Sequence, residues 1–318
     1  MSIMKADEIN KDDIVPDSER RGLIGALPAA WRPYASLIRL DRPIGAWLLF
    51  WPGAWSVALA GMGQRPPVSL GMSGWVLIAW LALGAWAMRS AGCVYNDIID
   101  RDLDRKVERT RLRPLASGRA SLKGAWVLLV AMSLIGLAVL LQLQRTAQIV
   151  ALLSLALVAL YPFMKRITWW PQAWLGLVFS WAALVGWPAV DGRMGAAAFL
   201  LWGGAVFWVI GYDTIYALQD KEDDALVGVK SSALALGRHA RAGVLVCYLA
   251  ALTFWVLAIR EVRLEWWAPL ALLPMALHLI GQVATLKPDD GANALAKFRS
   301  NRFAGLLMFA ACYVVGTA

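Results

Sequence analysis

The chain has 318 residues, of which 59% are hydrophobic and only 17% charged, and its formal net charge is +9 at pH 7. Soluble domains have about 45–50% apolar and about 25% charged residues. Because large exposed apolar patches associate or aggregate in water, this composition excludes an ordinary soluble domain. The fold class that we expect is all-α, a polytopic membrane bundle of helices.

Residues 1–30 are polar and of mixed charge, without an apolar run long enough for a cleaved signal peptide. Arg20 and Arg21 resemble a twin-arginine signal, but Pro28 and Pro33 interrupt the apolar run that follows them. We expect residues 1–35 to form a cytosolic tail with an amphipathic segment, and residues 36–318 to form one intramembrane domain.

Nine hydrophobic blocks have about the length that a helix needs to cross a bilayer, which is about 20 residues. The blocks cover residues 43–62, 72–96, 122–142, 147–163, 171–190, 196–217, 240–260, 266–286 and 301–317. With the N-terminus inside, the basic residues that fall on the outer side are Arg65, Arg145, Arg193, Arg260 and Arg263. All other Lys and Arg residues except Arg89 fall inside, as the positive-inside rule predicts for an odd number of spans. This topology explains the positive charge, so we expect a lipid bilayer as partner and no nucleic acid.

A first acidic motif, NDIIDRDLD, covers residues 96–104 at the inner end of the second block. Asn96, Asp100 and Asp104 are spaced i, i+4, i+8, so they form one polar stripe if the helix continues. Asp97 lies beside that stripe. Arg89 precedes Asn96 by about two helical turns and falls on the same stripe within the membrane, where an arginine normally faces a partner or a wet cavity.

A second acidic motif, YDTIYALQDKEDD, covers residues 212–224 at the inner end of the sixth block. Asp213, Tyr216, Asp220 and Asp224 follow helical spacing and share one face. Stacked carboxylates repel one another unless a cation neutralises them, and carboxylate and amide oxygens are ligands that Mg²⁺ prefers. The alternative is a solvated acidic loop that pairs with nearby arginines. Two such motifs at the same predicted surface favour a Mg²⁺–diphosphate site.

Basic residues near both motifs supply donors that suit a diphosphate. They are Arg109 and Arg113 after the first motif, Lys230 after the second, and Lys165 and Arg166 at the end of the fourth block. Some of these residues would alternatively only set the topology or contact anionic lipid. The ring of Tyr216 faces the second motif and could stabilise a cation.

These motifs resemble those of the UbiA superfamily of intramembrane prenyltransferases. The superfamily pattern NDxxDxxxD is met by Asn96, Asp97, Asp100 and Asp104, and the pattern DxxxD by Asp220 and Asp224. The segment RLDRPIG at residues 39–45, which contains Arg42, and the segment YPFMKR at residues 161–166 are similar to the benzoate-using branch. The likeness covers residues 36–317 and is specific, because two long motifs occur in order.

The resemblance implies a nine-helix bundle around a central cavity that opens to lipid. It implies that Asn96, Asp97, Asp100, Asp104, Asp220 and Asp224 hold Mg²⁺ and a polyprenyl diphosphate. Lys165 would contact the diphosphate, and Arg166 is a candidate for the carboxylate of 4-hydroxybenzoate, with Arg42 a further candidate for substrate binding. The implied reaction, in ubiquinone biosynthesis at a bacterial inner membrane, joins the prenyl group to the ring carbon ortho to the hydroxyl. Asp213 is a candidate for the base that removes the ring proton.

Other functions remain open from the sequence. Naphthoate, homogentisate or haem could replace benzoate, because the acidic motifs are shared across the superfamily. A cation-coupled transporter would also use intramembrane carboxylates, but it would place them near the bilayer midplane, in broken helices. A non-catalytic assembly subunit would leave the double acidic motif unexplained.

Overall fold

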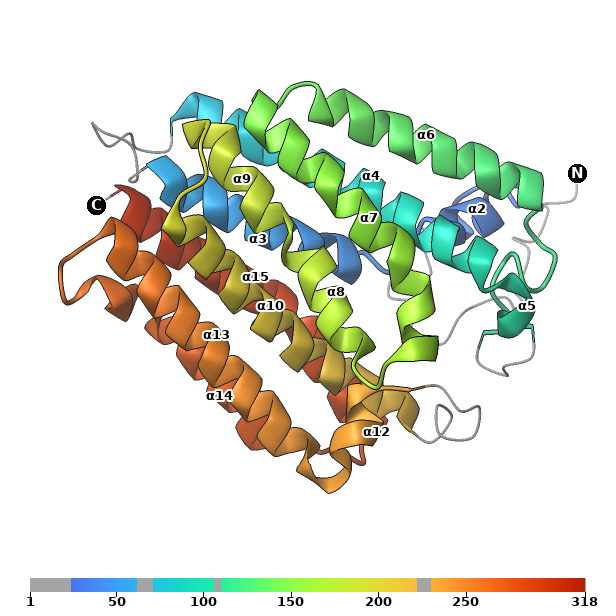
Figure 1. Cartoon of the computed structure of the whole chain (residues 1–318). Helices are drawn as coiled ribbons and strands as arrows, with labels where there is room; N and C mark the ends of the chain where they lie inside the picture. The colour runs from blue at the N-terminus through green and yellow to red at the C-terminus, as the bar shows by residue number, and fades with distance from the viewer. Residues whose placement is uncertain (1–23, 62–70, 106–109, 222–229, 318) are drawn as a thin grey trace, which may run out of the picture. The chain divides into compact units, whose positions relative to one another are not determined.

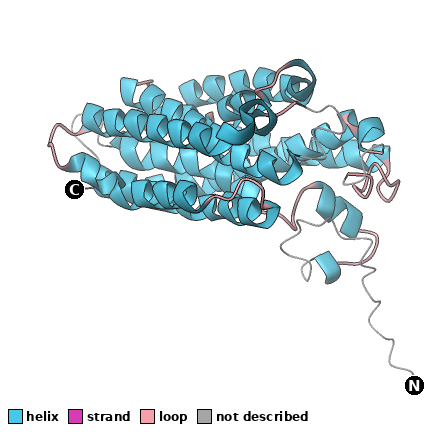
Figure 2. Ribbon diagram, turned by 90° about the horizontal axis from the view of Figure 1, so that it is seen from below, coloured by secondary structure: helices cyan, strands magenta, loops and turns pink. Residues whose placement is uncertain are grey.

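The computed structural model describes residues 24–61, 71–105, 110–221 and 230–317, and of Lys165, Arg166 and Asp220 it describes only the backbone. These parts of the chain contain helices and loops and no strand (Figure 2). The all-α class predicted from the composition is therefore confirmed. The chain divides into two compact units, the smaller made of Met1–Gly45 and Ala87–Ile135 and the larger of Ala46–Trp86 and Gly136–Ala318.

The smaller unit is built around the C-terminal part of one long helix. Its elements are α2 (Arg32–Leu37), the end of α4 (Met72–Ile99), α5 (Arg101–Asp104) and the start of α6 (Leu122–Leu140). Leu37, Val94, Leu115 and Ala125 form a buried core in which Tyr34 and Ile98 also take part. Because Leu115 belongs to the loop between α5 and α6, this core fixes that loop next to the end of α4.

The larger unit is a helical bundle in which α10 packs against α8, α13 and α15 (Figure 1). Its helices are α3 (Ile44–Ala60), α7 (Arg145–Ile167), α8 (Pro171–Ser180), α9 (Ala182–Asp191), α10 (Ala196–Ala217), η3 (Leu218–Asp220), α12 (Ser232–Leu236), η4 (Gly237–His239), α13 (Ala240–Val262), η5 (Ala268–Leu272), α14 (Leu273–Thr285) and α15 (Gly291–Thr317). Small residues let backbones approach closely, as membrane helices require. A Cβ at Gly186 in α9 would lie only 2.6 Å from the carbonyl oxygen of Gly53 in α3.

Every predicted hydrophobic block has a helical counterpart in the described residues. Seven described segments are long and apolar enough to cross a membrane, so the chain is a multi-pass membrane protein. Helix α3 is apolar but shorter, and α15 is not among the seven. The count of nine crossings stays a prediction.

Two helix boundaries differ from the predicted blocks. Helix α15 begins at Gly291, before the predicted start at residue 301, because Asp290 Oδ1 accepts a hydrogen bond from Asn293 N at 2.9 Å and supports the first turn. The basic residues that follow disfavour the bilayer interior but are good helix formers. The fifth block is interrupted at Trp181, whose indole donates to the carbonyl oxygen of Val150 at 2.8 Å.

Candidate functional site

The first acidic motif forms a tight turn between two helices. Helix α4 ends at Ile99 and α5 begins at Arg101, with Asp100 between them at φ −91° and ψ 1°. Asp100 N donates to Asn96 O at 2.9 Å, and Asp104 N donates to Asp100 O at 2.8 Å. Because both bonds span four residues, the turn keeps the helical register in which Asn96, Asp100 and Asp104 follow one another on one side.

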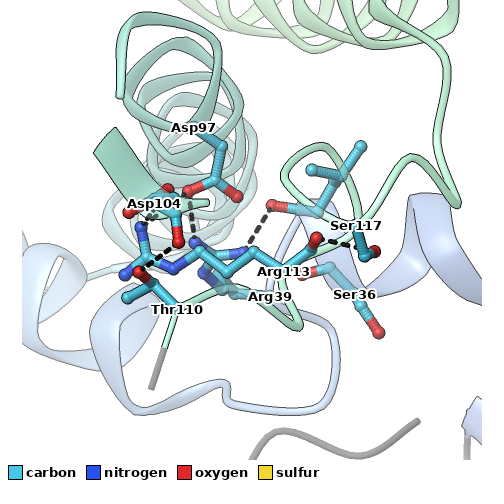
Figure 3. A network of polar contacts seen from close by, with 8 residues as sticks. Ser36, Arg39, Asp97, Asp104, Thr110, Arg113 and Ser117 are labelled. Atoms are coloured by element: carbon cyan, nitrogen blue, oxygen red, sulfur yellow. Dashed lines mark hydrogen bonds and ion pairs between the residues drawn. The ribbon is translucent and has the colours of Figure 1, made fainter. Parts of the chain in front are cut away.

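Three carboxylates of this motif are buried, and Arg113 pairs with two of them (Figure 3). Asp97, Asp100 and Asp104 are 1%, 0% and 5% exposed. Arg113 Nη1 lies 3.3 Å from Asp97 Oδ1 and 3.0 Å from Asp104 Oδ2, so one guanidinium bridges two carboxylates. Burying an unpaired charge costs roughly several kcal/mol, and the positive charge of Arg113 offsets part of that cost for the two carboxylates.

The environment of Asp104 disfavours the ionised form of its carboxyl group. Burial raises its pKa above the ordinary value, and the nearby charges of Asp97 and Asp100 add to the rise, whereas Arg113 opposes it. A divalent cation beside the group would favour the ionised form. The electrostatics of the motif are therefore those of a site that gains from further positive charge.

The loop after α5 positions Arg113. Thr110 Oγ1 donates to Asp104 O at 3.0 Å, and Arg105 Nε donates to Ala116 O at 3.1 Å. Ser117 Oγ donates to the carbonyl oxygen of Arg113 at 2.9 Å (Figure 3). These bonds hold residues 110–117 against the end of the acidic motif, and so the predicted substrate-binding residue Arg113 lies beside it.

Arg39 also contacts the first motif, although it was not among the predicted site residues. Its Nη2 lies 2.7 Å from Asp97 Oδ1. Burial would lower the pKa of Arg39, but the charge of Asp97 above all raises it beyond the ordinary value, so Arg39 stays charged. The only signal of this contact in the sequence is indirect: Arg39 is the first residue of the RLDRPIG segment, which indicated a resemblance to the family but no role for Arg39.

Arg89 packs against the first turn of α3. An ideal Cβ at Gly45 would lie 2.6 Å from Arg89 Nε, so a glycine is needed for the guanidinium to lie where it does. Arg42, the other predicted arginine of this region, has its Nε 3.4 Å from Asp41 Oδ2. Both arginines belong to the same unit as the first acidic motif.

The second acidic motif lies at the end of α10 in the larger unit. The α-helix ends at Ala217 and continues as the short 3₁₀ helix η3 to Asp220. The ring of Tyr216 lies 4.5 Å from that of Phe298 in α15, measured between centroids. Asp213 precedes Tyr216 on α10, in the last two turns of the helix.

Lys230, which follows the second motif in the sequence, lies at the end of α7. Its Nζ lies 3.4 Å from the carbonyl oxygen of Ile167 and 5.6 Å from the ring centroid of Trp169. The backbone nearby is fixed by Gln172, whose Oε1 accepts from Ser232 N at 2.9 Å. The structure thus brings Lys230 to the segment that carries the predicted Lys165 and Arg166.

Several predicted residues and the metal itself are not tested by this geometry. Arg109 and Asp224 lie outside the described residues, and the side chains of Lys165, Arg166 and Asp220 are not described either. Within the described parts of the chain, no group of three or more His, Cys, Asp or Glu side chains is arranged to hold a metal ion. The Mg²⁺ site therefore stays a prediction.

Comparisons with known proteins agree with the fold and identify the family. The model of the UbiA prenyltransferase family matches residues 49–312, which fall within the predicted intramembrane domain. A Caenorhabditis elegans protein named "4-hydroxybenzoate polyprenyltransferase, mitochondrial" is 42% identical over 292 residues, which cover 90% of this chain and 79% of that protein. The Arabidopsis thaliana protein of the same name is 41% identical, with 96% of this chain and 74% of that protein covered.

A solved structure shares the fold over most of both chains. A UbiA homolog from Aeropyrum pernix K1 superposes with a TM-score of 0.68 at 28% identity, covering 84% of this chain and 97% of that one. The chain belongs to the UbiA prenyltransferase family, as the resemblance of its acidic motifs predicted.

Proposed function

We propose that the protein is an aromatic prenyltransferase that joins a polyprenyl group to 4-hydroxybenzoate. The group would come from a polyprenyl diphosphate and bond to the ring carbon ortho to the hydroxyl, with release of diphosphate, in ubiquinone biosynthesis. The observation that carries this proposal is 42% identity, over 90% of the chain, to a relative named for that activity. The intact acidic motifs of this sequence support it.

The first motif fits a hard divalent cation by its chemistry. Its side-chain donors are carboxylate and amide oxygens, and the carboxylates of Asp97, Asp100 and Asp104 are buried. Asp97 Oδ2 is buried without a hydrogen-bond partner among the described residues. We propose Asn96, Asp100 and Asp104, with Asp97 as a further candidate, as Mg²⁺ ligands together with Asp220 and Asp224. A UbiA homolog from Archaeoglobus fulgidus, bound to GPP and Mg²⁺, shares the fold with a TM-score of 0.61 at 19% identity, covering 89% of this chain and 99% of that one.

Bound Mg²⁺ would neutralise the charge that develops on the leaving diphosphate. Lysine and arginine side chains would add donors to the same oxygens, which stabilises the transition state electrostatically. The proposed donors are Lys165, Lys230, Arg109 and Arg113. As the allylic C–O bond breaks, its electron pair leaves with the diphosphate. A site within a bilayer excludes the water that would otherwise capture the allylic cation.

The remaining residues are proposed to bind the acceptor and complete the reaction. Arg166, Arg42 and Arg89 are candidates for the carboxylate of the acceptor. The ring of Tyr216 would stabilise the cation through its π face. The ring carbon of the acceptor attacks the cation, and the ring proton is then lost to a base, for which Asp213 is proposed.

We propose a bacterial inner membrane, with the N-terminus and both acidic loops in the cytoplasm. The predicted positive-inside distribution of Lys and Arg supports this orientation. The named relatives are mitochondrial proteins.

Chelation of divalent cations is expected to abolish transfer without unfolding the protein. Membranes that contain the protein would be incubated with labelled 4-hydroxybenzoate, Mg²⁺ and polyprenyl diphosphates of several lengths, with and without EDTA. Product should disappear with EDTA and return when Mg²⁺ is restored, while helicity by circular dichroism is unchanged. Naphthoate and homogentisate in parallel reactions test the alternative acceptors. Transfer that persists in EDTA would contradict the proposal.

Gly45→Ala is expected to lower kcat/KM for the acceptor by about tenfold, because the added methyl group displaces the Arg89 guanidinium. Gly92→Ala is the matched control, since a Cβ at Gly92 in α4 meets nothing within 4 Å. Steady-state kinetics with varied 4-hydroxybenzoate would measure both. Equal kinetics for the two variants would show that the position of Arg89 does not matter for the acceptor.

A further inference from the structure

Arg39 combines an unusual backbone with a buried charge. Its φ is 58°, and it is the one non-glycine residue with positive φ in the described parts of the chain. This left-handed conformation is unfavourable for residues with a Cβ. The side chain is only 13% exposed. Strained backbones of this kind persist where the surrounding structure holds them, and they cluster at functional sites.

The guanidinium of Arg39 connects two segments of the smaller unit. Nη2 contacts Asp97 Oδ1 at 2.7 Å, at the end of α4. Nη1 donates to Ser36 O at 3.1 Å, near the end of α2. Beside them, Ser90 Oγ donates to Ile38 O at 3.3 Å, which ties the same loop to α4 about two helical turns before Asp97.

Asp97 is held from two directions through one oxygen. Arg39 and Arg113, which come from opposite sides of α4 in sequence, both contact Oδ1, while Oδ2 is buried without a hydrogen-bond partner among the described residues (Figure 3). The contact from Arg39 Nη2, at 2.7 Å, has the length of a strong charge-assisted hydrogen bond. A carboxylate fixed in this way fixes its own helical turn, in which Asn96 precedes it.

Stability alone does not explain the arrangement. A buried ion pair contributes little net stability, because desolvation of both groups opposes their attraction. The left-handed backbone of Arg39 opposes folding as well. Because both the desolvation of the ion pair and the left-handed backbone oppose folding, we explain the arrangement by the geometry that it imposes on the adjacent acidic motif.

We propose that Arg39 is a positioning residue that acts through Asp97 to hold the last turn of α4, and thereby Asn96 and Asp100, in the orientation that binds the divalent cation. This inference rests on the proposed metal-dependent transfer. Arginine is required at this position because its planar fork reaches the carboxylate and a carbonyl oxygen together, which the single ammonium group of lysine does not reproduce.

The test compares Arg39→Met and Arg39→Lys with Arg101→Met. Arg101 serves as the control because its Nε lies 3.9 Å from an Asp102 carboxylate that is 86% exposed, and exposed pairs contribute little. Arg39→Met should raise the half-saturating Mg²⁺ concentration for transfer by about tenfold to a hundredfold, as loss of a residue that orients a metal ligand does. Arg39→Lys should recover part of the loss, and Arg101→Met should match wild type.

A second readout does not need turnover. Mn²⁺ binding to the purified protein without substrates, followed by electron paramagnetic resonance, should weaken in Arg39→Met and not in Arg101→Met. If Arg39→Met fails to fold, Arg39→Gly removes the guanidinium and tolerates the left-handed backbone. Wild type that transfers no prenyl group would refute the proposed function, while the Mn²⁺ measurement would still decide the role of Arg39.

The double variant Arg39→Met/Asp97→Asn tests whether Arg39 acts through Asp97. If Arg39 acts through Asp97, each single change breaks the same link. The Mg²⁺ requirement of the double variant should then lie within about twofold of that of the more strongly impaired single variant, and should not be the product of both effects. Multiplied effects would overturn the proposal. So would an Arg39→Met protein that binds Mn²⁺ as Arg101→Met does.

Discussion

Asp100→Ala and Asp104→Ala should each lower the rate of prenyl transfer by at least about a hundredfold, because each removes a carboxylate that is proposed to hold the Mg²⁺ beside the leaving diphosphate. Both side chains are buried at the turn between α4 and α5. In the proposed site, they hold the cation that neutralises the diphosphate. Single-turnover transfer to labelled 4-hydroxybenzoate at saturating Mg²⁺ would measure the loss.

Asp102→Ala is the matched control for these variants. Asp102 lies within the same motif and carries the same charge, but its side chain is 86% exposed, and its ion pairs within the described residues are with Arg101 and Arg105. Its removal changes the net charge equally and should leave the rate within about twofold of wild type, since surface substitutions have small effects. A hundredfold loss shared by all three variants would point to general electrostatics and not to a specific site.

The first acidic motif could be predicted from the sequence because its chemistry is local. Helical spacing alone relates Asn96, Asp100 and Asp104, and the turn at Asp100 keeps that register. Arg113 could also be predicted as a site residue, because it follows the motif closely in the chain. Local periodicity and short separation are what the sequence reveals best.

The contact of Arg39 with Asp97 could not be predicted in the same way. The two residues are 58 positions apart, and the contact depends on the left-handed backbone of Arg39 and on a core that holds α2 near α4. Neither periodicity nor charge spacing encodes such a tertiary contact. The start of α15 was missed for a different reason, because hydropathy marks where a helix enters the bilayer and not where the helix begins.

Trp208 is one of the largest fully buried side chains of the larger unit, and its truncation is expected to cost much stability. It is 0% exposed in α10, and its ring lies 5.1 Å from that of Trp55 and 4.9 Å from that of Tyr212. Its Nε1 donates to Asn301 Oδ1 in α15 at 2.9 Å. One side chain therefore joins three helices at the level just before the second acidic motif.

Trp208→Ala should lower the free energy of unfolding by about 3–5 kcal/mol, as truncation of a large buried side chain does. In a bilayer, the loss comes mainly from van der Waals contacts and from the cavity, because lipid tails are as apolar as the protein core. Trp208→Phe keeps most of the ring packing but leaves Asn301 Oδ1 without its indole donor, which should cost about 1–3 kcal/mol.

Unfolding in detergent micelles, followed by helicity against added denaturant, would rank these variants. Trp266→Ala is the control, since Trp266 is 80% exposed and its loss should change the free energy by no more than about 0.5 kcal/mol. The order expected is Trp208→Ala, then Trp208→Phe, then Trp266→Ala. If Trp208→Ala were no less stable than Trp266→Ala, the packing of α10 against α3 and α15 could not be what fixes the helix that carries Asp213 and Tyr216.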